Sequence, residues 1–240
     1  MTFARREHLR TTIARTTGWV LLIIALASAI AAVAEPGFSS SVTAGLADRY
    51  AKLFGRSAKQ KLNNWQKFMQ SPDSGGGPAG RMTDASRMLD RVNDFVNRVP
   101  WKSDIEHWRV VDYWATPAET FASNGGDCED FVIAKYFALK ELGMPIGQLR
   151  LVYVRTPLSS DAHMVLAYYA KPEATPLILD NLNGRIVPAT ERPDLTPVYS
   201  FNDEDLTFAE GGTAPRGKFD PVQIRQWKDL RDRLQMELGG

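Results

Sequence analysis

The chain has 240 residues and nearly balanced charge, with 29 lysines and arginines against 28 aspartates and glutamates. This balance argues against a nucleic-acid-binding protein, which needs a clustered basic surface. A single cysteine excludes an intrachain disulfide, so stability must come from a hydrophobic core. The length favours one such core, and one domain over two.

Residues 1–34 have the pattern of a secretory signal peptide. Four arginines precede an uncharged run, residues 18–34, that ends in the small-x-small cleavage site Ala32-Val33-Ala34. The alternative is an uncleaved membrane anchor, for which the run is barely long enough. We therefore expect export to the periplasm and cleavage before Glu35. The mature chain, 35–240, then carries 25 basic (29 − 4) and 27 acidic (28 − 1) side chains.

The first part of the mature chain, 41–100, is predicted to be helical. Apolar residues recur at helical spacing over Ser41–Met69, which predicts one amphipathic helix or a pair. A Gly- and Pro-rich stretch, 72–80, interrupts this pattern. A second helical pattern runs over Thr83–Val99, with Thr83 as its candidate N-cap, until Pro100 ends it.

The next part, 101–202, combines a central helix with strands. A short helix is expected to open at Thr116-Pro-Ala-Glu119, and a longer one follows Cys128. Strand patterns then occupy 149–154, 163–169 and 177–180, and the last turns back through 181–184 into 185–187. The tail, 203–240, begins with acidic loop residues and ends in a helix over 221–238. The order of elements predicts an α+β fold, with helices packed on an antiparallel sheet.

Cys128 is the candidate nucleophile. It follows the glycine-broken segment Asn124-Gly-Gly-Asp127 and starts the central helix, where free backbone N–H groups and the helix dipole favour a thiolate. A lone cysteine is otherwise a small buried hydrophobe without chemistry. The flanking charges and glycines favour the catalytic interpretation.

His163 and Asp180 lie on predicted strands downstream and would complete a Cys-His-Asp triad. Strand alternation puts His163, Val165 and Ala167 on one face, which we expect to face the central helix. Asp180 has an alternative role as the first residue of a turn. His107 is better explained as a surface histidine.

A triad of this kind supports acyl transfer from a peptide or amide. His163 would accept the thiol proton, and Asp180 would orient the imidazole. The backbone N–H of Cys128 is one oxyanion donor by position, and Trp114 and Asn124 are weaker candidates for a second.

Three carboxylates, Asp127, Glu129 and Asp130, flank the cysteine and should oppose thiolate formation. Two explanations fit their spacing. Asp127 could be the helix N-cap, with the other two in the first turn, where negative charge is favourable. Alternatively, Asp127 and Asp130 lie on one side of the helix and could join other oxygens around Ca²⁺. Spacing alone favours capping.

Five motifs occur together in the chain: Tyr113-Trp-Ala-Thr-Pro-Ala-Glu119, Gly126-Asp-Cys-Glu-Asp-Phe131, Ala134-Lys-Tyr136, His163-Met-Val-Leu166 and Leu179-Asp-Asn-Leu182. With these motifs the chain resembles, from about residue 41 to residue 202, the bacterial transglutaminase-like cysteine proteases of the LapG type. The resemblance implies a papain/transglutaminase-like fold, the Cys128-His163-Asp180 triad and calcium dependence. The family's acidic site maps onto Asp127, Glu129 and Asp130, which reverses the preference for capping.

The resemblance also implies a biological role. Proteases of this family are periplasmic endopeptidases that cleave the N-terminal region of a large surface adhesin, usually after a di-alanine followed by glycine, and so release cells from biofilm. The periplasmic domain of an inner-membrane cyclic-di-GMP receptor inhibits them. Trp108 and Trp114 are the candidate contributors to the receptor-binding surface. The alternatives are a cell-wall peptidase or amidase with the same triad, and a non-catalytic periplasmic binding protein.

Overall fold

The computed structural model describes residues 42–71, 84–157, 162–209 and 224–239. The predicted signal peptide, the glycine-rich stretch and the candidate N-cap Thr83 lie outside these ranges. Residues Glu35–Gly240 form one compact unit. None of the helices in the described ranges is both long and apolar enough to cross a membrane.

The helical first part contains a helix pair and a third helix, as the apolar periodicity predicts. Helix α1 (Ala44–Phe54) is capped by Thr43, whose Oγ1 accepts from the Leu46 N–H at 3.1 Å. Gly55, with φ of +88°, supplies the left-handed backbone that turns the chain into α2 (Ser57–Gln70). Helix α3 (Asp84–Val96) follows. Buried apolar faces of all three helices join the main core.

Aromatic rings fix the packing of this part against helix α5 (Pro117–Ser123). Trp65 of α2 stacks on Phe121 of α5 with ring centroids 4.4 Å apart. Phe68 of α2 stacks on Phe95 of α3 at 4.0 Å. Such pairs stabilise a core by about 0.5–1.5 kcal/mol each beyond their buried area. These rings therefore hold α2, α3 and α5 together.

Two short helices lead to the central one. Helix α4 (Asp104–His107) is a single turn. Helix α5 begins with a reciprocal capping box between Thr116, its N-cap, and Glu119. At the end of α5, Asn124 takes a left-handed conformation with φ of +56°. The central helix α6 (Cys128–Glu141) starts four residues later and is buried over most of its length.

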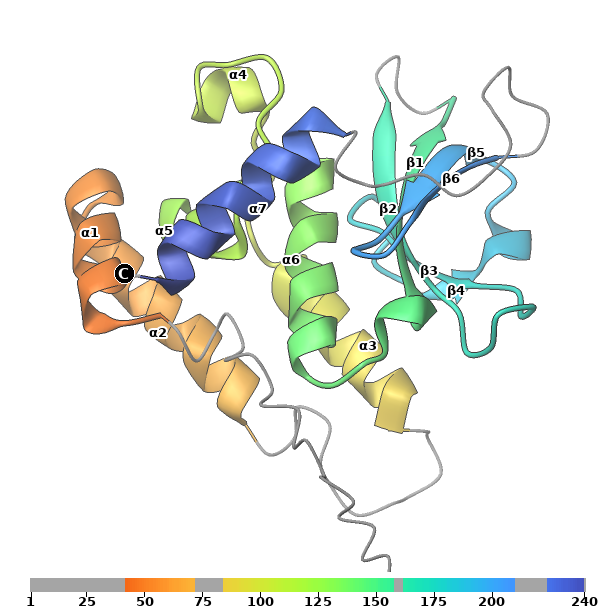
Figure 1. The fold of residues 1–240 in the computed structure, drawn as a ribbon, viewed down its shortest axis with the longest axis horizontal. Coiled ribbons are helices and arrows are strands. Elements are labelled where there is room, and N and C mark those ends of the chain that lie inside the picture. Colours follow the sequence, from red (N-terminus) through yellow and green to blue (C-terminus); the bar gives the residue numbers. More distant parts are fainter. Residues whose placement is uncertain (1–41, 72–83, 158–161, 210–223, 240) are drawn as a thin grey trace, which may run out of the picture. The chain divides into compact units, whose positions relative to one another are not determined.

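The sheet has six antiparallel strands in the order β4-β3-β2-β1-β5-β6 (Figure 1). The strands are β1 (Leu149–Arg155), β2 (His163–Tyr168), β3 (Leu177–Leu179), β4 (Val187–Pro188), β5 (Thr196–Phe201) and β6 (Leu206–Phe208). The predicted α+β fold is confirmed. Strands β5 and β6 are not apparent from the sequence, because β5 contains Pro197 and is only partly buried, and β6 has three residues.

Helix α6 packs on the face of β2 opposite to the one expected from the sequence. Met164 and Leu166 join the main core with the buried side chains of α6. Val165 and Ala167 belong to a second cluster on the other face of the sheet, with Val152 of β1. The prediction that Val165 and Ala167 face the helix is therefore wrong. The larger Met and Leu side chains bury more apolar area in the main core, which explains the choice of face.

The C-terminal helix α7 (Arg225–Leu238) confirms the helix expected over 221–238. Trp227, Leu230 and Leu234 are buried, as their spacing predicts. Trp227 stacks on Phe137 of α6 with centroids 5.8 Å apart. Helix α7 thus covers part of α6 (Figure 1).

Candidate active site

Cys128 is the first residue of α6, so its backbone N–H is one of the free donors at the helix N-terminus. The segment before it is held in place by an isolated bridge between Trp101 and Gly126, with the Lys102 N–H donating to the Gly126 carbonyl at 2.9 Å. Gly126 is required here, because a Cβ at this position would lie 2.8 Å from the Cβ of Asp130. The glycine before Cys128 therefore permits the close approach of loop and helix.

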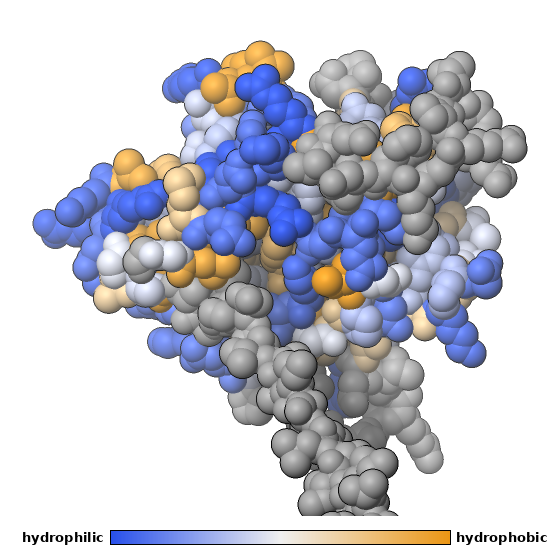
Figure 2. Space-filling view, in the orientation of Figure 1, coloured by the Kyte–Doolittle hydropathy of each residue, from blue (hydrophilic) through white to orange (hydrophobic). Residues whose placement is uncertain are grey.

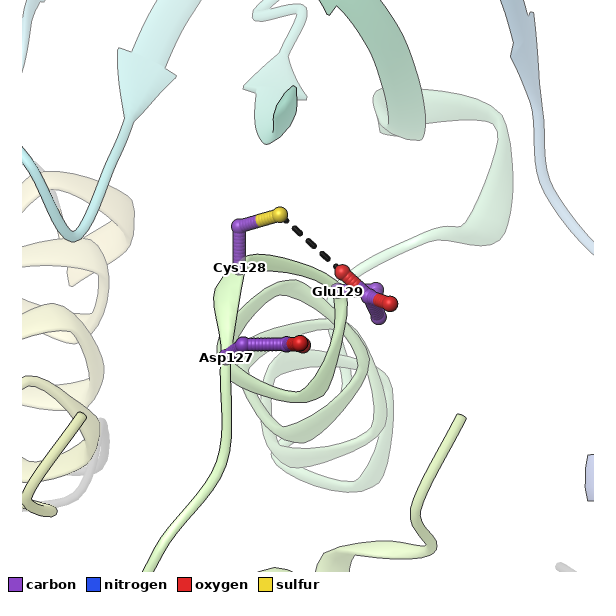
Figure 3. A group of neighbouring side chains, drawn as sticks. All are labelled: Asp127, Cys128 and Glu129. Atoms are coloured by element: carbon purple, nitrogen blue, oxygen red, sulfur yellow. Dashed lines mark hydrogen bonds between the residues drawn. The ribbon is translucent and has the colours of Figure 1, made fainter. Parts of the chain in front are cut away.

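The thiol of Cys128 lies between the acidic side of the helix and strand β2. Its Sγ donates to Oε2 of Glu129 at 3.0 Å (Figure 3). Burial raises the pKa of the thiol strongly, and Glu129 and Asp127 raise it further. The Met164 backbone N–H acts in the opposite direction. Burial first, and the neighbouring carboxylates second, thus favour the protonated thiol, which adjoins the residue that follows His163.

Five carboxylates gather on the acidic side of Cys128, and we call them the acidic cluster: Asp104, Asp112, Asp127, Glu129 and Asp130. Oxygens of Asp104, Asp127 and Asp130 lie within 4.8 Å of one another, as do those of Asp104, Asp112 and Glu129. Among the described residues, no lysine or arginine forms an ion pair with any of the five.

Burial, and then mutual repulsion, raise the pKa values of Asp104, Asp127 and Asp130. Burial raises the pKa of Asp104 to about 7, and Asp127 and Asp112 add to the shift. Burial and the charge of Glu129 raise the pKa of Asp127 to about 8. Asp130 is fully buried, and its pKa is raised well above the ordinary value, again first by burial. These carboxylates lack a compensating positive charge.

The acidic cluster fits a hard cation such as Ca²⁺. Oδ1 of Asp104 and Oδ1 of Asp127 are buried and have no hydrogen-bond donor in the described structure. Buried carboxylate oxygens are costly when unpaired, and Ca²⁺ binds six to eight oxygens of this kind. Asp130 also accepts from the backbone N–H groups of Ala115 (2.7 Å) and Asp127 (3.3 Å), so capping and metal binding are compatible at this helix start.

His163 and Asp180 meet at the start of β2, next to the Met164 backbone N–H that faces Cys128. The imidazole Nε2 lies 2.8 Å from Oδ1 of Asp180. Because an ionised carboxylate only accepts hydrogen bonds, Nε2 is the protonated nitrogen. His163 is 4% exposed and Asp180 is fully buried. The hydrogen bond therefore leaves Nδ1 as the ring nitrogen available to a substrate or to the thiol.

Arg192 supplies a positive charge beside Asp180. Arg192 follows the turn Ala189–Glu191, and its Nη2 lies 2.9 Å from Oδ2 of Asp180. The contact is an ion pair without hydrogen-bond geometry. Burial would raise the pKa of Asp180, but His163, the Leu182 N–H and Arg192 together lower it. We call His163, Asp180, Arg192 and Asp194 the balanced cluster.

Helix α3 and the residue that follows it hold the turn that carries Asp180. The side-chain amide of Asn97 donates to the Asp180 carbonyl at 3.0 Å, and that of Asn93 donates to the Gly184 carbonyl at 2.9 Å. Asp180 also accepts from the Leu182 N–H at 3.0 Å, as an aspartate that opens a turn does. The turn role and the contact with His163 thus coexist in one residue.

The weaker candidates occupy different surroundings. Trp114 is buried and stacks on Phe201, so its ring belongs to the core. Asn124 is the C-cap of α5, four residues before the cysteine. Trp108 is half-buried and packs edge-on against Phe54. His107 lies 2.7 Å from the hydroxyl of Ser123 and is not part of either cluster.

Exposed apolar residues lie instead around α4, at Trp101, Ile105, Val110 and Val111. Figure 2 shows this apolar surface over the segment that carries α4. Val111 is 85% exposed.

Sequence reasoning missed four residues of the two clusters. Asp104 and Asp112 lie in a segment without clear periodicity, and Arg192 and Asp194 lie in an irregular stretch after β4. No spacing rule connects them to Cys128 or Asp180, because only the fold brings them together.

Comparisons with known proteins identify the family. Residues 72–195 match the bacterial transglutaminase-like cysteine proteinases (BTLCP). The structure of LapG from Legionella pneumophila is 35% identical, with a TM-score of 0.64, and the match covers 79% of this chain and 96% of that one.

Two further LapG structures match similarly. An EGTA-treated form is 34% identical, with a TM-score of 0.65 over 79% of this chain and 96% of that one. A calcium-bound form is 35% identical, with a TM-score of 0.63 over 79% of this chain and 98% of that one. No match was found among curated proteins. The family match and the LapG structures together show that the chain belongs to the bacterial transglutaminase-like cysteine proteinases.

Proposed function

We propose that the protein is a periplasmic, calcium-dependent cysteine endopeptidase with Cys128 as nucleophile, His163 as general base and Asp180 as the residue that orients the histidine. The 2.8 Å contact between His163 Nε2 and Asp180 Oδ1, beside a cysteine at a helix N-terminus, is the observation that carries the proposal. Family membership supports the same reaction class.

The mechanism follows from which atoms are free. Asp180 accepts a hydrogen bond from the protonated Nε2 of His163, so Nδ1 is unprotonated and can accept the thiol proton. The thiolate then attacks the carbonyl carbon of the scissile peptide bond, and the backbone N–H of Cys128 donates to the developing oxyanion. The imidazolium returns the proton to the leaving amine, and water hydrolyses the acyl-enzyme by the same route in reverse order.

Calcium would be held by the acidic cluster, with Asp127, Glu129 and Asp130 on α6 and Asp104 and Asp112 from the segment around α4. When bound, the ion would supply the positive charge that this side of Cys128 lacks. Glu129 has a second role, because it accepts the hydrogen of the thiol. If Glu129 bound calcium, it would no longer accept the thiol hydrogen, and His163 could take that proton. A calcium-bound LapG structure among the similar proteins supports this assignment.

The substrate we propose is the N-terminal region of a large surface adhesin, cut after a di-alanine followed by glycine, with release of cells from biofilm. The periplasmic domain of an inner-membrane cyclic-di-GMP receptor is the proposed inhibitor. The exposed apolar residues around α4, among them Val111, would suit such a partner better than the buried Trp114.

The test is cleavage of an adhesin N-terminal fragment that contains the di-alanine-glycine site, using residues Glu35–Gly240, which form one compact unit. Wild type with calcium should cut the fragment, whereas wild type with excess EGTA and Cys128→Ala with calcium should not. Asp232→Asn, at an exposed position of α7, is the matched control and should behave as wild type.

Cleavage that survives EGTA would remove calcium from the proposal and leave the acidic cluster to helix capping. Cleavage by Cys128→Ala would exclude the nucleophile. If purified sacculi are cut and the adhesin fragment is not, the protein is a cell-wall peptidase. If neither is cut and a thiol-directed probe leaves Cys128 unlabelled, it is a binding protein.

A further inference from the structure

Asp180 is held from both sides of its carboxylate. Oδ1 accepts from His163 and from the Leu182 backbone N–H at 3.0 Å, and Oδ2 faces Arg192 at 2.9 Å. The side chain is fully buried, so water cannot replace any of these groups. If Arg192 were removed, nothing in the described contacts would hold Oδ2, and the carboxylate could rotate away from the imidazole.

Arg192 is itself fixed by a fork to Asp194. Its Nε lies 2.9 Å from Oδ1 and its Nη2 lies 2.8 Å from Oδ2 of that residue. Bidentate pairs of this kind set the plane of the guanidinium as well as its position. The guanidinium is 6% exposed. Its orientation toward Asp180 is therefore determined by the outer carboxylate and by burial.

The backbone brings the two residues together through one hairpin. Strand β3 ends just before Asp180, β4 pairs with β3, and the turn after β4 ends at Arg192. The Arg192 N–H donates to Ala189 at 3.0 Å, and the Leu195 N–H donates to the Arg192 carbonyl at 3.1 Å. Arg192 thus lies on a hydrogen-bonded turn with little freedom to move relative to Asp180.

We propose that Arg192 is a positioning residue for the hydrolysis: it acts through Asp180 to hold the His163 imidazole in its working tautomer and orientation, and Asp194 anchors it. This inference rests on the proposed function. Arg192 would not touch the substrate. Its loss should therefore lower kcat and leave KM nearly unchanged, since only the geometry of the reacting groups changes.

A purely structural role for Arg192, as a fastener of the β3–β4 hairpin, makes a different prediction. It would lower thermal stability and the fraction of active enzyme, but the molecules that remain folded would keep a normal His163–Asp180 contact. The imidazole Nε2 proton distinguishes the two roles. A carboxylate-bound imidazole N–H gives a downfield proton resonance in NMR spectra, and Glu35–Gly240 contains only two histidines, at 107 and 163.

The experiment compares wild type with Arg192→Gln, Arg192→Lys and Asp194→Asn, and uses His107→Gln to assign the resonance. For Arg192→Gln we expect kcat to fall about 10- to 100-fold, the usual effect of removing an outer partner, with the His163 N–H resonance broadened or moved upfield. Arg192→Lys keeps a positive charge, so its kcat and its His163 N–H resonance should lie between those of wild type and Arg192→Gln. Asp194 is partly exposed, so Asp194→Asn should fold and show a smaller change in the same direction.

Arg185→Gln is the matched control, because Arg185 is exposed and lies in the connection between β3 and β4, outside the balanced cluster. It should leave kcat and the resonance unchanged. An unaltered resonance and kcat in folded Arg192→Gln and Asp194→Asn would overturn the proposal, and so would equal effects of Arg192→Gln and Arg185→Gln. If wild type cuts no peptide, the proposed function fails, but the resonance still reports whether Arg192 positions His163.

Discussion

The two polar clusters beside Cys128 differ in how their charges are compensated. In the balanced cluster, the Asp180 carboxylate is shared between His163 and Arg192, and its pKa is lowered despite complete burial. In the acidic cluster, burial and repulsion raise the pKa of Asp104 to about 7 and that of Asp127 to about 8. One cluster contains its own positive charge, and the other has no lysine or arginine paired with it among the described residues.

This difference bears on why Cys128 is flanked by Asp127, Glu129 and Asp130, whose negative charges oppose formation of a thiolate. In the proposed function, Glu129 accepts the hydrogen of the thiol on the acidic side, and His163 of the balanced cluster is the base. The protein could then depend on an ion for activity without any direct contact between the ion and the substrate.

The largest expected effect comes from breaking the balanced cluster at its centre. Asp180→Asn replaces a carboxylate, which only accepts hydrogen bonds, by an amide whose NH2 group can donate to Nε2 of His163. The proton would then move to Nδ1, which the mechanism needs free. In a serine protease triad the equivalent change lowers kcat by about 10⁴-fold, and we expect a loss of the same order here. Steady-state cleavage assays measure it. Glu191→Gln, at an exposed neighbouring position, should change kcat less than about twofold.

Adding the missing charge to the acidic cluster should stabilise the protein. At a calcium concentration 100 times Kd, the free energy of unfolding should rise by about 2.7 kcal/mol. Asp130→Asn should remove most of this gain, because Asp130 is the fully buried member of the acidic cluster. Thermal melts with calcium, magnesium and EGTA measure the effect. Magnesium requires a smaller and more rigid coordination shell than calcium. An equal rise in the free energy of unfolding with magnesium would therefore contradict a calcium site.

Without calcium, the acidic cluster should make stability fall as pH rises. The folded pKa values of Asp104 and Asp127, about 7 and about 8, lie above the ordinary value of 3.8. Their contribution is therefore fully present below about pH 4 and is lost as pH rises through 7 to 8. We expect a decrease of about 2 kcal/mol between pH 5.5 and 8.5 in EGTA.

Saturating calcium should cancel or reverse this slope, because the ion binds the ionised carboxylates. Urea unfolding at several pH values, with and without calcium, gives the comparison. Asp104→Asn should flatten the slope in EGTA. A slope that is unchanged by both calcium and Asp104→Asn would show that other groups cause it.

The sequence predicts the balanced cluster better than the acidic one. His163 and Asp180 lie on strands with clear apolar patterns, so their proximity can be inferred from the order of elements. Arg192 could not be predicted, since it lies in an irregular turn. Asp104 and Asp112 come from the irregular segment around α4, and only the packing of that segment against the start of α6 places them near Glu129.

The sheet shows the same limit. Alternation along β2 predicts correctly which residues share a face, but it does not say which face meets a helix. That depends on the total apolar area of each face across all strands, and β5, which adds Phe201 to the main core, is not visible as a strand in the sequence. The triad prediction relied on this choice of face, and what supports its His163–Asp180 pair in the structure is the direct contact between the two side chains.

Lys135 is a buried amine near Asp180 that has no ion-pair partner among the described residues. Its substitution gives the smallest predicted change in stability. Lys135 is fully buried on α6, and its Nζ has no hydrogen-bond acceptor among the described residues. Burial lowers its pKa from 10.5 to about 7, and the charge of Asp180 opposes the shift. The favourable contribution of the neutral amine is therefore present above about pH 10.5 and is lost as pH falls through 7.

Lys135→Met keeps the length of the side chain and removes the charge, so it should stabilise the protein by about 1–2 kcal/mol at pH 6 and by much less at pH 10. Lys67→Met, at an exposed position of α2, should change stability by less than about 0.5 kcal/mol at either pH. If Lys135→Met is destabilising at pH 6, the ammonium group is compensated by Asp180 after all. In that case the balanced cluster would extend into α6, and the contrast between the two sides of Cys128 would be larger than the ion pairs alone indicate.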